Sequence, residues 1–518
     1  MKWIRRIGLG LLALVIIAGL GLWIVLPPVS YPVLGSLANL FPEYFDAPSV
    51  DSELINERLI LADGYYLTVF AQDVPGARVV RNTSAGDLLV SSSTLNQVLW
   101  LQRDLSGDGR SALKKVLLKD LDGPHGLDIF DGYLYVAEEN RIGRIAFDEA
   151  NGETHGEYQV LIQDLPTGGN HWRKVIRFGP DRLLYVSVGS SCNVCLEADE
   201  RRAAMLRFTS EGEYLGIYAS GLRNSAGFDW APGSKALFAT DNGRDLLGDD
   251  FPPCELNEIV EGAFYGWPFA SGMALAKPIP DPDFGGGRNA VIASSQVPVF
   301  DFPAHNAPLG MVFLRGRAHP LKQMQTGSEV ALVALHGSWN RSEKDGYKVV
   351  SLSFDATGEI EMKDFLSGFL RDGDVIGRPA EISESDDQFI YISDDYANAI
   401  YRVGLGNGAG LMTGESIPQE IEASVFAYSG LDITQSDRDQ AMLEGPALFD
   451  TFGCTACHVF SSDQVPPDGR VVLGDVAKHK DLDAVMAFLA RPKPPMPPFQ
   501  GSREEGRLLS LYLLEKSL

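Results

Sequence analysis

The chain has 518 residues, of which 45% are hydrophobic, and a formal net charge of −25 from 44 basic and 69 acidic side chains. This length allows about three domains, and the apolar fraction is ample for packed cores, which argues against a largely disordered chain. The acidic balance argues against nucleic acid as a partner, because phosphate binding needs a positive surface.

The N-terminal segment has the features of a membrane anchor. Residues 8–26 carry no charge and are long enough to span a bilayer, and Lys2, Arg5 and Arg6 precede them. The basic residues favour a cytoplasmic N-terminus, so we expect an anchor over residues 1–28 and export of the rest. A cleaved signal peptide is the alternative, although no small-x-small cleavage site follows the apolar run. The expected location is the bacterial inner membrane, with the following domains in the periplasm.

Residues 29–55 contain prolines, serines and aromatic residues and are interpreted as a tether, and residues 56–404 have a uniform β texture. A degenerate unit recurs there, made of a turn with Asp or Gly, a strand, a polar loop and another strand. Six such units predict an all-β, six-bladed β-propeller, whose radial repetition protects the sheet edges. A β-sandwich would explain the alternation but not the repeated turn and strand signature. The clearest strands of the units are 87–90, 131–137, 183–188, 235–240, 330–335 and 389–393.

Cysteine spacing within the propeller region is informative. Cys192 and Cys195 form a C-x-x-C pair with no histidine after it, and Cys254 stands alone. Outside the cytoplasm the pair favours a local disulfide, whereas a zinc site would lack ligands. Cys254 is expected to be a free thiol.

The sequence pattern of the C-terminal region differs from that of the propeller region. Residues 405–435 begin with closely spaced glycines and are interpreted as a flexible linker, and residues 436–518 have helical periodicity. Cys454, Cys457 and His458 form the C-x-x-C-H attachment motif of haem c. Each thiol can bond the porphyrin covalently, and the histidine is then held under the iron as a ligand. This stretch resembles a class I cytochrome c, a small all-α domain.

Met496 is the expected second iron ligand. It lies between two pairs of prolines, which stiffen a loop able to present one thioether. Ligation by methionine and histidine leaves no open iron position, so the haem is expected to carry electrons. The alternative is a loop methionine that packs on apolar neighbours.

An electron-carrying domain fused to a propeller implies that the propeller oxidises a substrate. No G-x-G-x-x-G motif follows a strand, and nicotinamide and flavin folds are α/β, so a different cofactor at the propeller mouth is the simpler hypothesis. Several segments, in order along the chain, resemble the glucose/sorbosone dehydrogenase family over most of residues 60–403. They are Asn170-His171-Trp172, Phe178-Gly179-Pro180-Asp181, Gly221-Leu222-Arg223-Asn224, Glu255-Leu256-Asn257, Tyr265-Gly266-Trp267-Pro268 and Gly377-Arg378-Pro379.

The resemblance implies pyrroloquinoline quinone (PQQ) with calcium as cofactors. PQQ carries three carboxylates, for which forked and permanently charged arginines are suited. By resemblance, Arg223 and Arg378 hold the quinone, Asn224 hydrogen-bonds beside it, and Arg341 is a further cationic contact. For each arginine the alternative is an ion pair at the surface or between blades.

The resemblance also assigns the general base and the calcium loop. His171 matches the residue that removes the hydroxyl proton as hydride leaves the substrate, and His125 is the rival for this role. Calcium would polarise the quinone carbonyl and would be bound by backbone carbonyls of residues 241–253. Cys254 departs from the family pattern, because an acidic residue is common at that position.

The sequence therefore predicts an anchored periplasmic enzyme that oxidises a sugar, sugar aldehyde or polyol through PQQ. Haem c would pass the electrons to a respiratory acceptor, such as a downstream cytochrome or terminal oxidase. Two alternatives remain open at this point. One is a calcium-dependent, lactonase-like propeller hydrolase, and the other is a non-catalytic propeller that serves as a platform for an anchored cytochrome.

Overall fold

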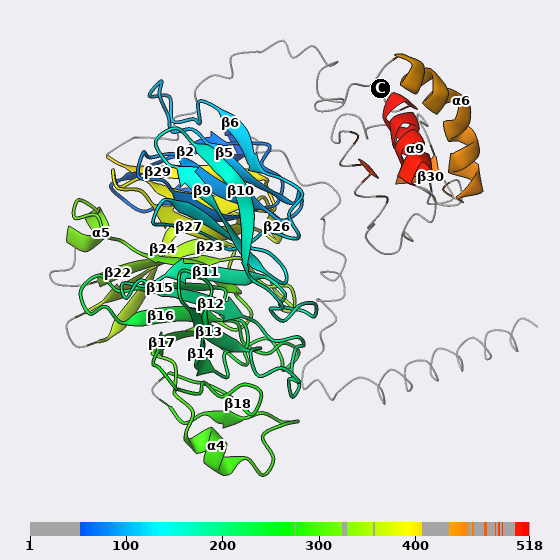
Figure 1. The fold of residues 1–518 in the computed structure, drawn as a ribbon. Helices are drawn as coiled ribbons and strands as arrows, with labels where there is room; N and C mark the ends of the chain where they lie inside the picture. The colour runs from blue at the N-terminus through cyan, green and yellow to red at the C-terminus, as the bar shows by residue number, and fades with distance from the viewer. Residues whose placement is uncertain are drawn as a thin grey trace, which may run out of the picture. The chain divides into compact units, whose positions relative to one another are not determined.

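The computed structural model describes residues 52–274, 276–323, 329–355, 358–406, 435–452 and 503–516, together with isolated residues between 454 and 489. The chain divides into two compact units, Met1–Gly414 and Glu415–Leu518. The first unit contains six antiparallel sheets arranged as blades, which confirms the predicted six-bladed propeller (Figure 1). The predicted anchor, tether and linker fall outside the described residues, except for residues 52–55, 405–406 and 435.

Five blades have four strands and the fifth blade has five. In the first four blades the strand that comes first along the chain is innermost. The first three blades are β3 (Ala77–Asn82), β4 (Leu88–Ser92), β5 (Gln97–Leu101) and β6 (Lys114–Leu118); β7 (Leu127–Phe130), β8 (Tyr133–Ala137), β9 (Ile142–Asp148) and β10 (Glu153–Ile162); and β11 (Lys174–Phe178), β12 (Leu184–Val188), β13 (Ala204–Phe208) and β14 (Tyr214–Ser220). The fourth is β15 (Gly227–Trp230), β16 (Leu237–Asp241), β17 (Cys254–Ile259) and β20 (Phe300–Phe302).

The last two blades are completed by strands from the start of the propeller. The fifth is β21 (Pro308–Phe313), β22 (Glu329–Leu335), β23 (Lys348–Phe354) and β24 (Ile360–Ser367), with β1 (Ile60–Leu61) at its edge; the sixth is β27 (Pro379–Glu384), β28 (Ile390–Asp394) and β29 (Ala399–Leu405), with β2 (Tyr65–Ala71) outermost. Antiparallel pairing of β2 with β29 joins the two ends of the propeller. This pairing closes the ring, because a strand from the start of the propeller completes its last blade.

The hydrophobic core lies between the blades. Six clusters of buried apolar side chains occur in the first unit, and each is shared by two neighbouring blades. Strands β4, β12, β16 and β28 are buried along their whole length, because both faces of a blade pack against a neighbour. A continuous apolar strand in this sequence therefore marks the middle of a blade.

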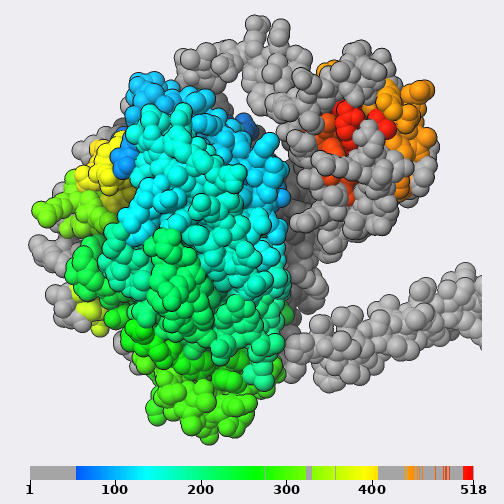
Figure 2. Space-filling model, in the orientation of Figure 1, coloured from blue at the N-terminus to red at the C-terminus, as the bar shows by residue number. Residues whose placement is uncertain are grey.

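Smaller elements decorate the ring. The segment between β17 and β20 carries the hairpin β18 (Ala270–Ser271) with β19 (Ile279–Pro280) and the helix α4 (Asn289–Ala293), and it protrudes from the fourth blade (Figures 1 and 2). The remaining additions are α3 (Ser52–Arg58), α5 (Pro320–Gln323) and the hairpin β25 (Leu370–Arg371) with β26 (Asp374–Val375).

The second unit is described mainly by α6 (Gln435–Thr451) and α9 (Arg503–Lys516), with the parallel pair β30 (His458–Val459) and β31 (Val471–Val472). The helices pack closely, since a Cβ at Gly445 would lie 2.3 Å from that of Tyr512. Cys454 and His458 belong to the described residues, and Cys454 packs against the apolar core of this unit. Cys457 and Met496 lie outside them, so the structure tests neither the haem attachment nor the second ligand.

No helix among the described residues is both long and apolar enough to cross a membrane.

Candidate functional site

A pocket lies on the propeller axis, on the face where all six innermost strands begin. It encloses about 550 Å³ of space between atoms, part of it open to solvent. Its lining comes from the first residues of each inner strand or the turn before it: Arg78 and Val79, His125, the run Asn170–Arg173 with Val175, the run Asn224–Ala226, Leu309, and Ala380 with Glu381. Closure of the ring therefore places six separate chain segments around one pocket on the axis.

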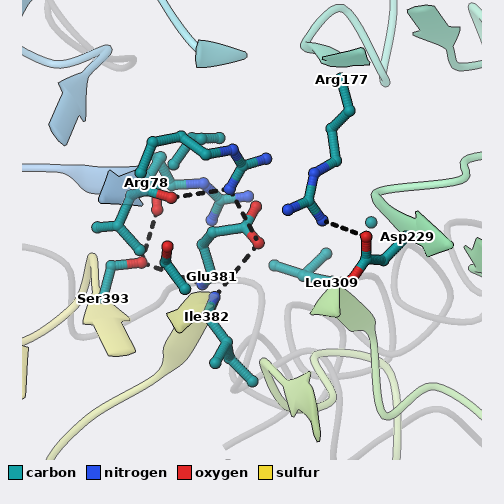
Figure 3. Close-up of polar contacts among 12 residues, drawn as sticks. Arg78, Arg177, Asp229, Leu309, Glu381, Ile382 and Ser393 are labelled. Atoms are coloured by element: carbon teal, nitrogen blue, oxygen red, sulfur yellow. Dashed lines mark hydrogen bonds and ion pairs between the residues drawn. The ribbon is translucent and has the colours of Figure 1, made fainter. Parts of the chain in front are cut away.

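Below the pocket the axis is filled by charged side chains from the inner strands, which we call the axial ring. Figure 3 shows Arg177 of β11 pointing at Asp229 of β15, at 3.4 Å. Arg81 of β3 lies 3.8 Å from Glu381 of β27. The ring consists of Arg81, Asp128, Arg177, Asp229 and Glu381.

The remaining inner strand, β21, contributes a glycine at this level. A Cβ at Gly310 would lie 2.6 Å from both Cα and Oε1 of Glu381, so only glycine leaves room for that carboxylate. Burial raises the pKa of Asp128 and Glu381. Burial also acts to raise the pKa of Asp229, but Arg177 and Arg315 together bring it below its ordinary value. The ring is therefore a buried, partly compensated charge network at the floor of the pocket.

His171, the predicted base, lines the pocket. Its Nδ1 is 2.9 Å from Oγ and 3.1 Å from the carbonyl oxygen of Ser190, which follows β12. Burial and the nearby Arg223 guanidinium lower the pKa of His171 to about 4, so its imidazole is neutral near pH 7. Gly189 is required beside it, because a Cβ there would lie 2.5 Å from the His171 Cβ and 2.9 Å from Oδ1 of Asn224.

His125, the rival base, lines the same pocket but is held more deeply. Its Nδ1 is 3.0 Å from the carbonyl oxygen of Lys174, and the side chain is buried. Burial holds its pKa well below the ordinary value, with Arg78 and Arg173 adding to the effect. Both histidines are therefore neutral bases at the pocket wall.

Asn224 lines the pocket, and Arg223 lies behind it. The carboxylate of Asp241, at the end of β16, accepts the backbone N–H of both residues, at 2.9 and 2.6 Å. The Arg223 guanidinium bonds Oδ1 and the carbonyl oxygen of Asn193 and forms an ion pair of 2.9 Å with Asp245. Burial, with the neighbouring Glu255 carboxylate, raises the pKa of Asp241. Arg223 is thus fixed by the protein and touches the pocket only through its neighbour.

Arg378 and Arg341 do not line the pocket either. Arg378 donates to the carbonyl oxygens of His336 and Gly337 at 3.0 and 2.9 Å, and its guanidinium lies over the Tyr347 ring. Arg341 donates to the Asp249 carbonyl oxygen at 2.5 Å, within the loop that the sequence suggested for calcium. The structure therefore brings together His171, His125 and Asn224, and leaves the three predicted arginines outside the lining of the pocket.

Two arginines that the sequence did not predict, Arg78 and Arg173, do line the pocket. Arg78 pairs with Asp395 at 2.6 Å, and Asp395 is also 2.8 Å from Nε2 of His336. The guanidinium of Arg173 lies over the ring of Trp172, 4.6 Å from its centroid. Arg173 could have been found, because it directly follows the Asn-His-Trp motif, whereas Arg78 has no local signal.

Several buried amides at this face have unused hydrogen-bonding atoms. Asn340 is 3% exposed, and among the described residues neither its Oδ1 nor its Nδ2 has a partner. The Oδ1 atoms of Asn242 and Asn306 are likewise unpaired within the described part of the chain. Buried amides are normally satisfied, so these atoms leave hydrogen-bonding capacity near this face, although none of the three residues lines the pocket. The pocket arginines fit an anionic ligand such as PQQ.

Comparisons with known proteins agree with this architecture. A protein of Borreliella burgdorferi is 30% identical over 372 residues, which is 68% of this chain and 93% of the relative. A calcium structure of the Trichoderma reesei carbohydrate-active enzyme of family AA12 has a TM-score of 0.58 at 18% identity and covers 67% of this chain and 97% of its own. The holo form of the pyranose dehydrogenase PQQ domain from Coprinopsis cinerea has a TM-score of 0.57 at 18% identity and covers 69% and 98%.

At these identities the solved structures establish the shared fold. The family model described as TrAA12-like matches residues 59–252 and 261–370, which together are more than half of the chain and span five of the six blades. The chain belongs to the TrAA12-like family.

Proposed function

We propose that this protein is a membrane-anchored periplasmic quinohaemoprotein that oxidises a sugar, sugar aldehyde or polyol through PQQ and passes the electrons on through haem c. The observation that carries the proposal is the axial pocket, where a neutral histidine, an asparagine and two arginines converge. The similarity in fold to the holo form of a pyranose dehydrogenase PQQ domain supports the cofactor, and the C-x-x-C-H motif supports the haem.

His171 is the residue best placed to take the substrate's hydroxyl proton. Its Nδ1 is engaged by Ser190, and Nε2 has no hydrogen-bond partner among the described residues. Because burial keeps the ring neutral at pH 7, Nε2 can accept a proton without first losing one. When bound, PQQ would accept the hydride, and with it two electrons, from the substrate carbon that carries this hydroxyl group.

Cofactor binding would involve the pocket arginines and Asn224. Arg78, Arg173 and Asn224 line the cavity and can meet carboxylates and ring carbonyls. Arg223, Arg341 and Arg378 then act mainly by fixing the loops around the cavity, which is a smaller role than the resemblance implies. Calcium would be held by carbonyl oxygens of the loop 241–253, which Arg341 ties to the fifth blade.

The haem domain would receive the electrons singly. Cys454 and Cys457 would hold the haem, with His458 and Met496 as iron ligands. A downstream cytochrome or terminal oxidase would be the acceptor, and residues 8–26 would keep the protein at the membrane.

The hydrolase alternative finds less support. It requires a cluster of oxygen-bearing side chains able to bind calcium on the axis. Among the His, Cys, Asp and Glu side chains of the described residues, the one group of three ligand atoms within 4.8 Å of one another is Cys192, Cys195 and Glu197. The axial carboxylates are instead matched with arginines, as Asp229 is with Arg177.

The proposal is tested by dye reduction in protein loaded with PQQ and calcium and offered a panel of aldoses and polyols. His171→Gln is expected to lower kcat by about 10²- to 10⁴-fold, the usual contribution of a general base. His155→Gln on the exposed strand β10 is the matched control and should behave as wild type. Sugar-dependent dye reduction that is equal in the two variants would contradict the role of His171, and lactone hydrolysis without PQQ would favour the hydrolase.

A further inference from the structure

The loop between β12 and β13 contains the Cys192–Cys195 disulfide, which confirms the pairing expected from the sequence. This loop includes Ser190, which contacts His171, and Asn193, which contacts Arg223. The disulfide therefore closes a four-residue segment that contains Asn193 and begins two residues after Ser190.

The contact between Ser190 and His171 determines which of the two donates the hydrogen bond. The Ser190 hydroxyl donates to the Cys192 carbonyl oxygen at 2.7 Å, so its single proton is used. Its oxygen can then only accept a hydrogen bond from His171 Nδ1, 2.9 Å away, and the Ser190 carbonyl oxygen at 3.1 Å can also only accept. Nδ1 of His171 must therefore carry the hydrogen, which leaves Nε2 as the basic nitrogen.

The contacts of Asn193 connect the disulfide loop to Arg223 and to Asp245. Oδ1 of Asn193 accepts from the Arg223 guanidinium and from the backbone N–H of Asp245, both at 2.9 Å. Its Nδ2 donates to the Asp245 carbonyl oxygen at 3.0 Å, and its own carbonyl oxygen accepts from Arg223 Nε at 2.9 Å. The Asn193 side chain and backbone thus hold both the arginine and the loop suggested for calcium.

The geometry points to a positioning role for the disulfide loop: the Cys192–Cys195 bond holds the Cys192 carbonyl and Asn193 so that His171 keeps its Nδ1–H tautomer and Arg223 stays locked to Asp245. This inference concerns residues of this chain that support the proposed base, and it rests on the proposed function only for its kinetic consequence. Glu197 supports the same loop, since its carboxylate accepts the N–H and the hydroxyl of Ser191, at 2.6 and 2.8 Å. That use of Glu197 favours a braced loop over a metal site formed with the two cysteines.

The electrostatic surroundings of His171 depend on the same arrangement. Arg223 and Arg202 act to lower its pKa, and Asp245 acts to raise it, after burial, which is the largest cause. Arg202 donates to the carbonyl oxygen of Gly168 at 3.1 Å, which precedes the His171 turn. Loosening the loop would admit water and separate these charges, so both the tautomer and the pKa of His171 should change together.

The test reads the tautomer directly in the full-length protein. Histidine labelled with ¹⁵N is introduced, and long-range proton–nitrogen correlation spectra are recorded near pH 7, with His171→Gln identifying the His171 signals. Wild type is expected to show His171 as the Nδ1–H form. The variant Cys192→Ser/Cys195→Ser is expected to show a mixture of the two tautomers, while Cys254→Ser, which leaves the disulfide intact, should match wild type.

Chemical reduction of the wild-type disulfide provides a second test in case the variant Cys192→Ser/Cys195→Ser does not fold. Wild-type protein is treated with dithiothreitol, which breaks the S–S bond with two electrons and two protons, gives two thiols and closes into its own cyclic disulfide. The thiols are then alkylated and located by mass spectrometry, and circular dichroism checks that the propeller is retained. The same mixture of tautomers is expected for His171, with no change at His125, whose Nδ1 bonds Lys174 rather than the loop.

Three results would overturn the inference: an Nε2–H form of His171 in wild type, an unchanged Nδ1–H form once the disulfide is open, or free thiols at both cysteines in the exported protein. The kinetic consequence is tested separately in PQQ-loaded protein, where opening the disulfide should lower kcat at least tenfold and change KM much less. The tautomer is measured without cofactor, so this test of the positioning role does not depend on whether the protein oxidises sugars.

Discussion

Gly189 offers a sharp test of how the site is built. It follows β12, and its φ angle does not lie in the left-handed region, so alanine is permitted by the backbone and its effect is steric. The new Cβ would stand 2.5 Å from the His171 Cβ, whereas ordinary contact begins at 3.4 Å. The two groups must therefore separate by about 0.9 Å, and Asn224 Oδ1, at 2.9 Å, must also move.

A displacement of about 1 Å at a catalytic group costs roughly 100-fold in rate. Gly189→Ala should therefore lower kcat about 100-fold in PQQ-loaded protein, while overpacking costs about 1–3 kcal/mol of stability. Gly286→Ala is the matched control, because nothing lies within 4 Å of its added Cβ and its φ angle is also permissive. Stopped-flow dye reduction and thermal unfolding measure the two effects. A Gly189→Ala enzyme with wild-type kcat would refute the idea that His171 and Asn224 are positioned through this glycine.

Three further outcomes are expected. The acid limb of the kcat/KM profile should lie near pH 4, because burial lowers the pKa of His171 to about 4 and the base is lost only below that value; a limb near 6.5 would contradict a buried base. Asp229→Asn should cost about 3–5 kcal/mol in chemical denaturation, since it removes the buried carboxylate that is paired with both Arg177 and Arg315. The exposed ion pair of Asp131 is the control, and Asp131→Asn should cost less than about 1 kcal/mol. Cys457→Ser should leave haem attached through one thioether at most, seen as a shifted reduced band; unchanged spectra and full retention under denaturing conditions would contradict the assigned motif.

The fold could be predicted because the strands follow local rules. Continuous apolar runs such as β12 and β22 are bounded by glycine and aspartate turns, and six such units occur in order. The closure of the ring could not be read in the same way. Strand β2 pairs with β29 more than 300 residues away, and nothing in either segment names the other as its partner.

Part of the site could be predicted because some of its residues lie in local sequence motifs. His171 and Asn224 stand in motifs that carry a recognisable local pattern, and both line the pocket. Arg78 lines it as well, but it lies at the start of β3 within an ordinary strand sequence, and only ring closure brings it to the axis. The axial ring was missed because its members, such as Asp128, are single charges within separate strands, where the sequence does not show that they face one another.

The predicted arginines show the limit of motif transfer. Arg223 and Arg378 stand where the family pattern places cofactor contacts, yet both guanidinium groups are bonded to oxygen atoms of the protein itself. A sequence motif identifies which residue is present at a loop, but the hydrogen-bond partners depend on distant carbonyls such as that of His336. Which arginines line the pocket and which only hold its surrounding loops therefore depends on the folded propeller and not on the local motif.

The most direct test of the account is the absorbance spectrum of the purified full-length protein produced in a host that attaches haem c. Spectra are taken before and after addition of PQQ, calcium and members of a panel of aldoses and polyols. The account predicts that the bands of reduced haem appear only when PQQ and a suitable sugar are both present. A haem that dithionite reduces, but that no sugar reduces in the presence of PQQ and calcium, would contradict the proposed relay and favour a propeller that acts as a docking platform.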